Sequence, residues 1–351
     1  MNAEIRASMD FGIITPLPVE LESVLAQTKS YSRIVLEQND NRTYYKTSIL
    51  TERKWNYEIV ITLLPRMGNL DSALATSDML HLWKPRFILV IGIAAGMRKE
   101  EQEFGDVLIG ESILYYEQSK TKEEGTEIRP RILIADPLLY DRALNFSLES
   151  KDWFTRIPEK MRLLRPEGYR PKAHFGPLAS GEKIVASRSA AESLRMHHPK
   201  LIGLEMESAG VASAALSSVE KIGFLPIRGV SDFADADKND DWHQYASSAA
   251  AAWAFGFLSS GPVTPHTNQE PQRVRSYTSP TTDRVELYNQ IRTRIDNEDF
   301  KTLCFMLGVD VDDIPGDRKG ARVRELILYF ERRGALEKLA QMWAHYQKDS
   351  V

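Results

Sequence analysis

Short apolar runs alternate with stretches of helical periodicity over residues 11–258 of the chain. The apolar runs are rich in Val, Ile and Leu over short windows, a composition typical of strands buried on both faces. These runs cover residues 11–15, 58–64, 86–94, 106–115 and 225–231. The alternation predicts an α/β domain organised around a largely buried sheet.

Helices are expected between these strands. Residues 69–83 and 207–219 carry apolar and small side chains at helical spacing, and Asn, Ser and Gly bound both stretches. The alanine-rich residues 247–258 predict the last helix of this part of the chain. We therefore place a first domain at residues 1–258.

A different composition follows this domain. Residues 259–282 contain four prolines among Ser, Thr, Gln and Asn, which predicts a linker. Apolar residues return at helical spacing from Asp283 onward and predict a small all-helical bundle over residues 283–351. Its apolar faces are formed by Leu287, Ile291, Ile295, Phe300, Leu303, Cys304, Leu307, Val323, Leu326, Ile327, Phe330, Leu336, Leu339 and Met342.

Charge and cysteine content exclude several classes of protein. The formal net charge is −4 with both signs interspersed, so no overall basic field points to nucleic acid. Cys304 is the single cysteine, which excludes an internal disulfide framework and fits a reducing compartment. The sequence shows neither a signal-peptide pattern nor an apolar run of membrane-spanning length. We expect a cytoplasmic protein that binds neither nucleic acid nor membrane.

Four candidate sites lie at or just after the carboxyl end of a predicted strand, where α/β sheets place ligands. They are Glu20, the glycine-bearing residues 92–96, the pair Glu205 and Glu207, and Asp232. Each has an ordinary structural explanation. Glu20 can be a solvated acid in the first turn of a helix, Glu207 an acid at a helix N-terminus, and Asp232 a helix cap.

In combination and in this order, the sites resemble the nucleoside phosphorylase and nucleosidase family, particularly its methylthioadenosine/S-adenosylhomocysteine nucleosidase branch. The strongest matches are LEMES at residues 204–208 and RGVSDFAD at residues 228–235. The sequence GIIT with Glu20 downstream and the sequence FGDVLIG at residues 104–110 support them. The resemblance covers roughly residues 10–258 and implies a mixed central sheet flanked by helices.

The resemblance implies hydrolysis of the N-glycosidic bond of an adenine nucleoside or nucleotide, and it assigns roles to residues. Glu207 matches the acid that hydrogen-bonds the ribose hydroxyls, and Met206 matches the methionine that packs against the sugar. Asp232 matches the acid that protonates the leaving purine, a role open to a buried carboxyl near neutral pH. Glu20 matches the general base for water, and Arg228 the arginine near that water.

The same resemblance adds Ile93, Ala94, Gly96 and Ser231 as substrate-binding candidates. Phosphorolytic members carry an arginine before the glycine-bearing run and a serine after its first glycine, which together hold phosphate. Val90 and Ile93 stand at those places here. Water is therefore the expected nucleophile, although nucleosidases often have serine at the place of Ile93.

A second departure concerns the segment that binds the base. Residues 179–186 read ASGEKIVA where nucleosidases have SGDAFI and use the aromatic residue against the base. Ile184 takes the place of that aromatic, and Lys183 places a positive charge near the base-binding segment. In a separate segment, Arg66 stands where the family often has glycine. Both basic side chains can be merely solvated. Alternatively, one or both contact a 5′-phosphate chain, and the substrate is a nucleotide such as ATP.

The tail over residues 283–346 resembles the small death-like, effector-associated domains of bacterial conflict systems, which recruit a partner through a matching domain. LGVD at residues 307–310, IPG at residues 314–316 and the helix ELILYFERRG ending at Gly334 carry this resemblance. It implies a protein partner and a regulated antiphage effector. A purely structural helical appendage is the alternative.

Two other functions remain open. One is a nucleotide-sensing module that has lost turnover and signals through the tail, and the other is a phosphorolytic salvage enzyme with a rebuilt phosphate site. Retention of Glu20, Glu207, Arg228 and Asp232 together favours a hydrolase, because binding alone requires neither a base nor an acid. We expect no cofactor, no metal, and a homo-oligomer, because family members generally assemble as dimers or larger.

Overall fold

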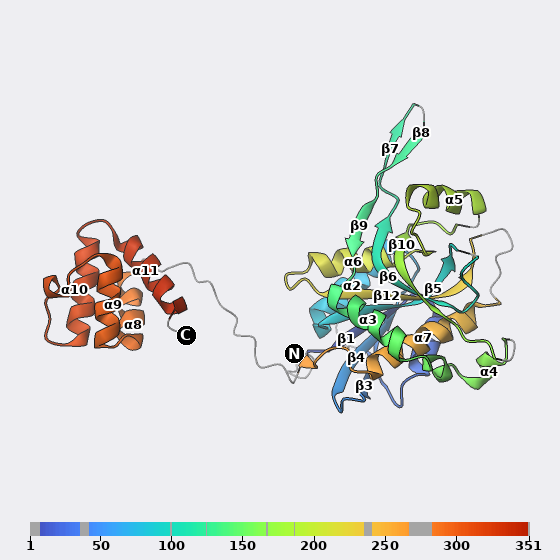
Figure 1. The fold of residues 1–351 in the computed structure, drawn as a ribbon, viewed down its shortest axis with the longest axis horizontal. Coiled ribbons are helices and arrows are strands. Elements are labelled where there is room, and N and C mark those ends of the chain that lie inside the picture. Colours follow the sequence, from blue (N-terminus) through green and yellow to red (C-terminus); the bar gives the residue numbers. More distant parts are fainter. Residues whose placement is uncertain are drawn as a thin grey trace. The chain divides into compact units, whose positions relative to one another are not determined.

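The computed structural model describes residues 8–35, 42–98, 100–123, 125–165, 168–185, 187–234, 241–266 and 283–349. The chain divides into two compact units between Glu270 and Pro271, and each unit is considered by itself (Figure 1). None of the helices in the described ranges is long and apolar enough to cross a membrane.

The first unit is built around one large sheet. Its strands are β1 Phe11–Thr15, β2 Ser32–Val35, β3 Thr43–Leu50, β4 Asn56–Leu63, β5 Phe87–Gly96, β6 Val107–Tyr115, β9 Arg131–Ile134, β10 Ala173–Ser180, β11 Gly203–Glu205 and β12 Gly223–Asp232. The strand order is β11-β10-β6-β12-β5-β1-β4-β3-β2, and β9 pairs with β6. Because β11 also pairs with β5, the strands β5, β12, β6, β10 and β11 close into a ring.

The sheet mixes parallel and antiparallel pairs. β1 lies parallel to β4 and β5, β12 lies parallel to β5, and β10 lies parallel to β6 and β11. β12 runs antiparallel to β6, and β2, β3 and β4 form antiparallel neighbours. A separate hairpin of β7 Ser119–Lys122 and β8 Gly125–Ile128 projects from this body (Figure 1). The predicted mixed central sheet is confirmed.

Helices pack around the sheet. They are α1 Pro18–Leu25, α2 Asn69–Trp83, α3 Pro137–Glu149, the 3₁₀ helix η2 Trp153–Arg156, α4 Glu159–Arg162, α5 Arg188–His197, α6 Ser208–Ser217 and α7 His243–Ser259. α2 packs against α6, and α7 packs against α1, β5 and β12. Every residue of α7 from Tyr245 to Leu258 is buried, which explains why small alanine side chains dominate this helix.

The predicted apolar runs all lie in strands, namely β1, β4, β5, β6 and β12. β5 continues to Gly96, so the glycine-bearing run belongs to the strand. A Cβ at Gly92 would meet the Arg228 guanidinium and the Glu20 carboxylate, both at 2.5 Å. Glycine at this position therefore allows the strand to pass close to two buried charged side chains.

The second unit is the predicted helical bundle. It consists of α8 Arg284–Arg294, α9 Asn297–Leu307, the 3₁₀ helix η4 Val311–Asp313, α10 Lys319–Glu331 and α11 Leu336–Asp349. Asp296 and Asp299 form a capping box at the start of α9, and Gly308 ends that helix with a φ of 70°. The predicted apolar faces meet in one core around Leu303 and Ile327.

Residues 267–282 of the predicted linker lie outside the described residues. The part of it that is described belongs with the first unit. Val263 is buried, and its backbone N–H donates a hydrogen bond to the Tyr57 hydroxyl at 3.1 Å. The N–H of His266 donates to Asp10 at 2.5 Å. The first unit thus continues beyond residue 258.

Candidate active site

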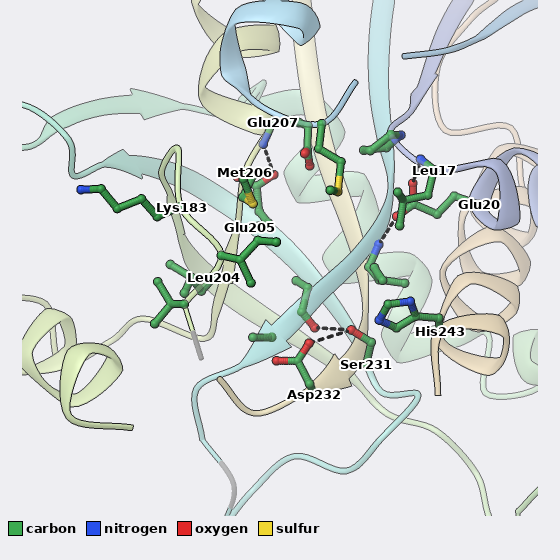
Figure 2. A pocket seen from close by; sticks show the side chains of 17 residues that line it. Leu17, Glu20, Lys183, Leu204, Glu205, Met206, Glu207, Ser231, Asp232 and His243 are labelled. Carbon is green, nitrogen blue, oxygen red and sulfur yellow. Dashed lines mark hydrogen bonds between the residues drawn. The ribbon is translucent and has the colours of Figure 1, made fainter. Parts of the chain in front are cut away.

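A cavity of about 370 Å³ opens at the carboxyl ends of β1, β5, β11 and β12 (Figure 2). These four strands are separated by long stretches of sequence, and the sheet brings their ends to one place. The predicted residues that line the cavity are Glu20, Ile93, Ala94, Lys183, Ile184, Met206, Glu207, Ser231 and Asp232.

Glu20 lies in the first turn of α1 and is only 1% exposed, which contradicts the explanation as a solvated acid. Its carboxylate accepts hydrogen bonds from the backbone N–H of Leu17 at 2.6 Å and of Ile93 at 2.8 Å. Burial raises the pKa of Glu20 to about 8, although the positive charge of Arg228 opposes this rise. Glu20 therefore exchanges its proton near neutral pH, as a general base requires.

The two glutamates that flank Met206 have different surroundings. The Glu205 carboxylate accepts hydrogen bonds from the N–H groups of Glu207 at 3.0 Å and Ser208 at 2.9 Å, so it caps the start of α6. The Glu207 carboxylate accepts from the N–H of Gly68 at 3.1 Å. Burial raises the pKa of Glu207, while Arg228 lowers it.

Arg228 is fully buried on β12 and lies outside the cavity lining that the described residues form. Its guanidinium makes an ion pair with Glu205 and another with Glu207 at 3.3 Å. Breaking a buried ion pair leaves an uncompensated charge, so this arrangement fixes both carboxylates strongly. The placement allows Arg228 to orient the acids without contacting a substrate.

A second layer of hydrogen bonds ties α2 to this region. The side-chain oxygen of Asn69 accepts from the Ser180 hydroxyl at 3.1 Å and from the N–H of Gly210 at 2.8 Å. The Ser72 hydroxyl donates to the backbone carbonyl of Glu207 at 2.8 Å. The position of Glu207 therefore depends on how α2 packs against α6.

Asp232 ends β12 and is buried at the cavity wall. Its carboxylate accepts from the Ser231 hydroxyl at 3.2 Å and from the N–H of Ala234 at 2.9 Å. The next helix in the described part of the chain, α7, begins only at His243, so Asp232 does not cap it. The helix-cap explanation is wrong for this residue.

The segment predicted to bind the base lies at the rim. Ile184 lines the cavity but is 59% exposed. The Lys183 side chain is 75% exposed, pairs with Glu117 at 3.1 Å, and extends away from the cavity in Figure 2. Two predicted substrate-binding residues, Arg66 and Gly96, are not among the described residues that line the cavity. Arg66 is exposed, and Gly96 pairs with Gly203 of β11.

Several lining residues were not predicted from the sequence. They are Pro16, Leu17, Met67, Val185, Leu204 and His243. Leu17 and Met67 each lie within a few residues of a predicted position, so proximity in sequence could have indicated them. His243 carried no such signal, because the predicted helix began at residue 247 whereas α7 begins at His243.

Known proteins resemble both units of the chain. Residues 287–344 match Effector-associated domain 7, and the chain carries that domain as its tail. The chain is 31% identical over 268 residues to the ATP nucleosidase Cap17 of Escherichia coli (strain KTE188), covering 71% of this chain and 51% of that protein. It is 28% identical over 204 residues to the Death domain-containing ATP nucleosidase of Amphimedon queenslandica, covering 55% and 37%. The chain therefore spans about half or less of these relatives.

Solved structures show the same fold for the first unit. The 5′-methylthioadenosine/S-adenosylhomocysteine nucleosidase of S. pneumoniae superposes with a TM-score of 0.57 at 21% identity, covering 72% of this chain and 99% of that one. Residues 10–258 match the Phosphorylase superfamily. The family resemblance of the sequence is thereby confirmed, and the chain belongs to the phosphorylase superfamily.

Proposed function

We propose that this protein hydrolyses the N-glycosidic bond of an adenine nucleoside or nucleotide and releases adenine. The main support for this proposal is that Glu20, Glu207 and Asp232, which come from three separate elements, line the same cavity. A base, a sugar-binding acid and a proton donor are the groups that this reaction needs.

Glu207 and Met206 bind the ribose. The Glu207 carboxylate accepts hydrogen bonds from the ribose hydroxyls, and Met206 packs against the sugar ring. As the bond to the base breaks, positive charge builds on the ribose, and a buried carboxylate beside it stabilises that charge. The ion pair with Arg228 keeps Glu207 in place without occupying the cavity.

The remaining two acids exchange protons with water and purine. The water oxygen forms a bond to C1′ while Glu20 takes one of its protons. The bond between C1′ and the purine breaks, its electron pair stays on the purine, and Asp232 supplies a proton to a ring nitrogen. The hydrogen bonds from Ser231 and Ala234 hold the Asp232 carboxyl in position.

The surroundings of the run 92–96 favour water over phosphate as the nucleophile. Val90 is fully buried and apolar, so it supplies no charge for an anion. The N–H of Ile93, which could otherwise bind phosphate, donates to Glu20. Phosphate would also face the carboxylates of Glu20 and Glu207 in a buried site, where like charges repel strongly.

The tail suggests regulation of this activity. Two relatives are named as ATP nucleosidases, one of them death domain-containing, and the tail matches an effector-associated domain. We propose that the protein is a cytoplasmic antiphage effector that recruits a protein partner through its tail, acts on a nucleotide such as ATP, and works as a homo-oligomer.

A chromatographic assay of free adenine tests the proposal. Adenosine, methylthioadenosine, AMP and ATP are incubated with the full-length chain, with and without inorganic phosphate. We expect adenine from at least one substrate without any need for phosphate. A strict requirement for phosphate would support the phosphorolytic alternative, and tight binding without adenine release would support the sensing module.

A further inference from the structure

A second pocket, of about 510 Å³, lies apart from the cavity described above. Residues of η2 and α4, of the segments 163–165 and 168–171, and Tyr245 of α7 line it. Both η2 and α4 pack against α7, so the pocket rests on a buried helix (Figure 1). Within the described ranges, the two linings have no residue in common. The proposed hydrolysis therefore makes no use of this second pocket.

The charge of the second pocket is opposite to that of the first cavity. Its described lining carries three arginines, Arg162, Arg165 and Arg170, against one acid, Glu159. Four carboxylates line the first cavity instead. Arg162 and Arg170 are exposed, and neither forms an ion pair with another described residue. Their charges are therefore open to an anionic ligand.

Arg165 supplies a positive charge that is fixed in place. Its side chain is only 9% exposed, and its guanidinium donates to the Glu103 carboxylate at 2.9 Å. The guanidinium carbon lies 3.6 Å from the centre of the Tyr169 ring and 5.0 Å from the centre of the Trp242 ring. The buried Nε has no hydrogen-bond acceptor in the part of the chain that is described, so Glu103 satisfies only part of this guanidinium.

Aromatic side chains give the pocket flat apolar surfaces beside these charges. Phe154, Tyr169 and Tyr245 all belong to the lining. The Arg170 guanidinium carbon lies 5.5 Å from the centre of the Phe154 ring, so a charge and a ring adjoin at this point. Arginines bind phosphate oxygens through paired N–H groups, and aromatic rings stack on planar bases. The volume is in the range of sites that hold small organic ligands.

We propose that this pocket is a second binding site, for a phosphate-bearing ligand with a planar ring, such as a nucleoside diphosphate. Arg162 and Arg170 bind the phosphate oxygens, Arg165 adds a fixed positive charge, and Phe154 contacts the ring. This inference goes beyond the proposed hydrolysis and does not depend on it, because no residue of the first cavity takes part.

Calorimetry with GDP, inorganic pyrophosphate and guanosine measures binding to the full-length chain. We expect GDP to bind more tightly than pyrophosphate, because the base adds stacking, and at least about tenfold more tightly than guanosine, because the phosphates meet the arginines. Arg162→Ala and Arg170→Ala should each raise the Kd of GDP about tenfold. Both side chains are exposed, so the variants should fold normally, which thermal denaturation checks.

Two control variants locate the bound GDP. Arg142→Ala is the matched control, because Arg142 is an exposed arginine of α3 outside the lining, and it should change the Kd of GDP less than about twofold. Met206→Ala alters the first cavity and should likewise leave the Kd of GDP unchanged.

Unchanged GDP affinity in both pocket variants would overturn the proposal. A loss of affinity in Met206→Ala alone would also overturn it, because GDP would then occupy the first cavity. Pyrophosphate binding as tight as that of GDP would contradict the planar ring, and a lack of binding by GDP at millimolar concentration would contradict the site. Adenine release is measured separately, so failure of the proposed hydrolysis would leave these outcomes unaffected.

Discussion

Glu20 links the chemistry of the site to the stability of the fold. Its pKa rises from an ordinary 4.5 to about 8 because the carboxyl is buried. Between these values the folded chain keeps a proton that the unfolded chain loses. The free energy of unfolding therefore decreases as pH rises through this window, by roughly 1 kcal/mol per pH unit from this group alone.

Replacing Glu20 with a residue that does not titrate should remove its contribution to this pH dependence. We expect Glu20→Gln to raise the melting temperature relative to the native chain, and to raise it more at pH 8 than at pH 5, because glutamine has no charge to bury. Thermal denaturation at both pH values measures this. An equal shift at the two pH values would show that Glu20 does not titrate between them.

The same pKa predicts how activity depends on pH. A general base must be ionised, so kcat/KM for adenosine should rise from pH 6 through pH 8 and level off about one pH unit above 8, where Glu20 is almost fully ionised. Initial rates across this range in a constant-ionic-strength buffer check the prediction. A flat profile from pH 6 to pH 8 would remove Glu20 from the role of base.

Asp232 can be tested without disturbing its surroundings. Asparagine can still accept from the N–H of Ala234 and can donate to Ser231, so Asp232→Asn should fold normally. We expect adenine release to fall by about 100- to 10,000-fold. Nitrophenyl riboside, whose leaving group needs no proton, is the control substrate and should be cleaved at a similar rate by both proteins. Equal losses on both substrates would argue against an acid role.

At this scale the sequence predicted which acids gather at the cavity but not how they are held. LEMES and RGVSDFAD indicated Glu207 and Asp232, and the structure places both at the wall. Glu205 caps α6 by accepting hydrogen bonds from backbone N–H groups. Almost every residue has such a group, so the sequence alone does not show which ones a carboxylate will contact. His243 could not be found, because it reaches the cavity only through the start of α7.

Among the helices and strands, the packing of α2 on α6 sets the position of Glu207. A Cβ at Gly210 would clash with the backbone carbonyl of Asn69 and with the Ser72 hydroxyl. The backbone of Asn69 cannot move aside as a flexible side chain can, so α2 and α6 would have to move apart. Ser72 would then lose its contact with the Glu207 carbonyl.

Gly210→Ala should therefore lower the free energy of unfolding by about 2 kcal/mol, despite the better helix propensity of alanine. Adenine release should fall as well, because Glu207 shifts with α6. Urea denaturation and the release assay measure the two effects. Ser213→Ala, a half-buried position on the same helix, is the control and should be near neutral. If the Gly210→Ala protein were fully active and stable, the packing of α2 on α6 would not determine the position of Glu207.

Strands with an uninterrupted apolar run were predictable, and strands without one were not. β1, β4, β5, β6 and β12 have apolar runs because they are buried on both faces, and α2 was predicted with its observed bounds. β10 contains Gly176 and Pro177, which interrupt an apolar pattern, and β11 has three residues. Those two strands form part of the ring of β5, β12, β6, β10 and β11, so the ring itself was not predicted.

Two separate apolar cores stabilise the two units of the molecule. The buried apolar residues of the first unit surround the sheet, and those of the tail cluster around α8 to α11. A domain with its own core can in principle unfold on its own. The proposed catalytic residues all belong to the first unit, whereas the match to an effector-associated domain belongs to the tail.

Damage to the tail core should consequently leave catalysis intact. Leu303→Ala removes a fully buried side chain, and we expect it to lower the stability of the tail by about 2–5 kcal/mol while the unfolding transition of the first unit stays in place. Calorimetry and adenine release of the full-length chain measure this. Phe305→Ala is the control on the same helix, because Phe305 is 85% exposed. Loss of both transitions in Leu303→Ala would show that the units unfold together.

Water is the proposed nucleophile that breaks the bond between adenine and ribose in the cavity. The most direct test compares the amounts of free adenine and of reducing sugar formed from one substrate by the full-length chain in phosphate buffer. Hydrolysis leaves a free hydroxyl at C1′, so we expect equal amounts of free adenine and reducing sugar. Adenine without reducing sugar would mean that a sugar 1-phosphate had formed, and the claim would be contradicted.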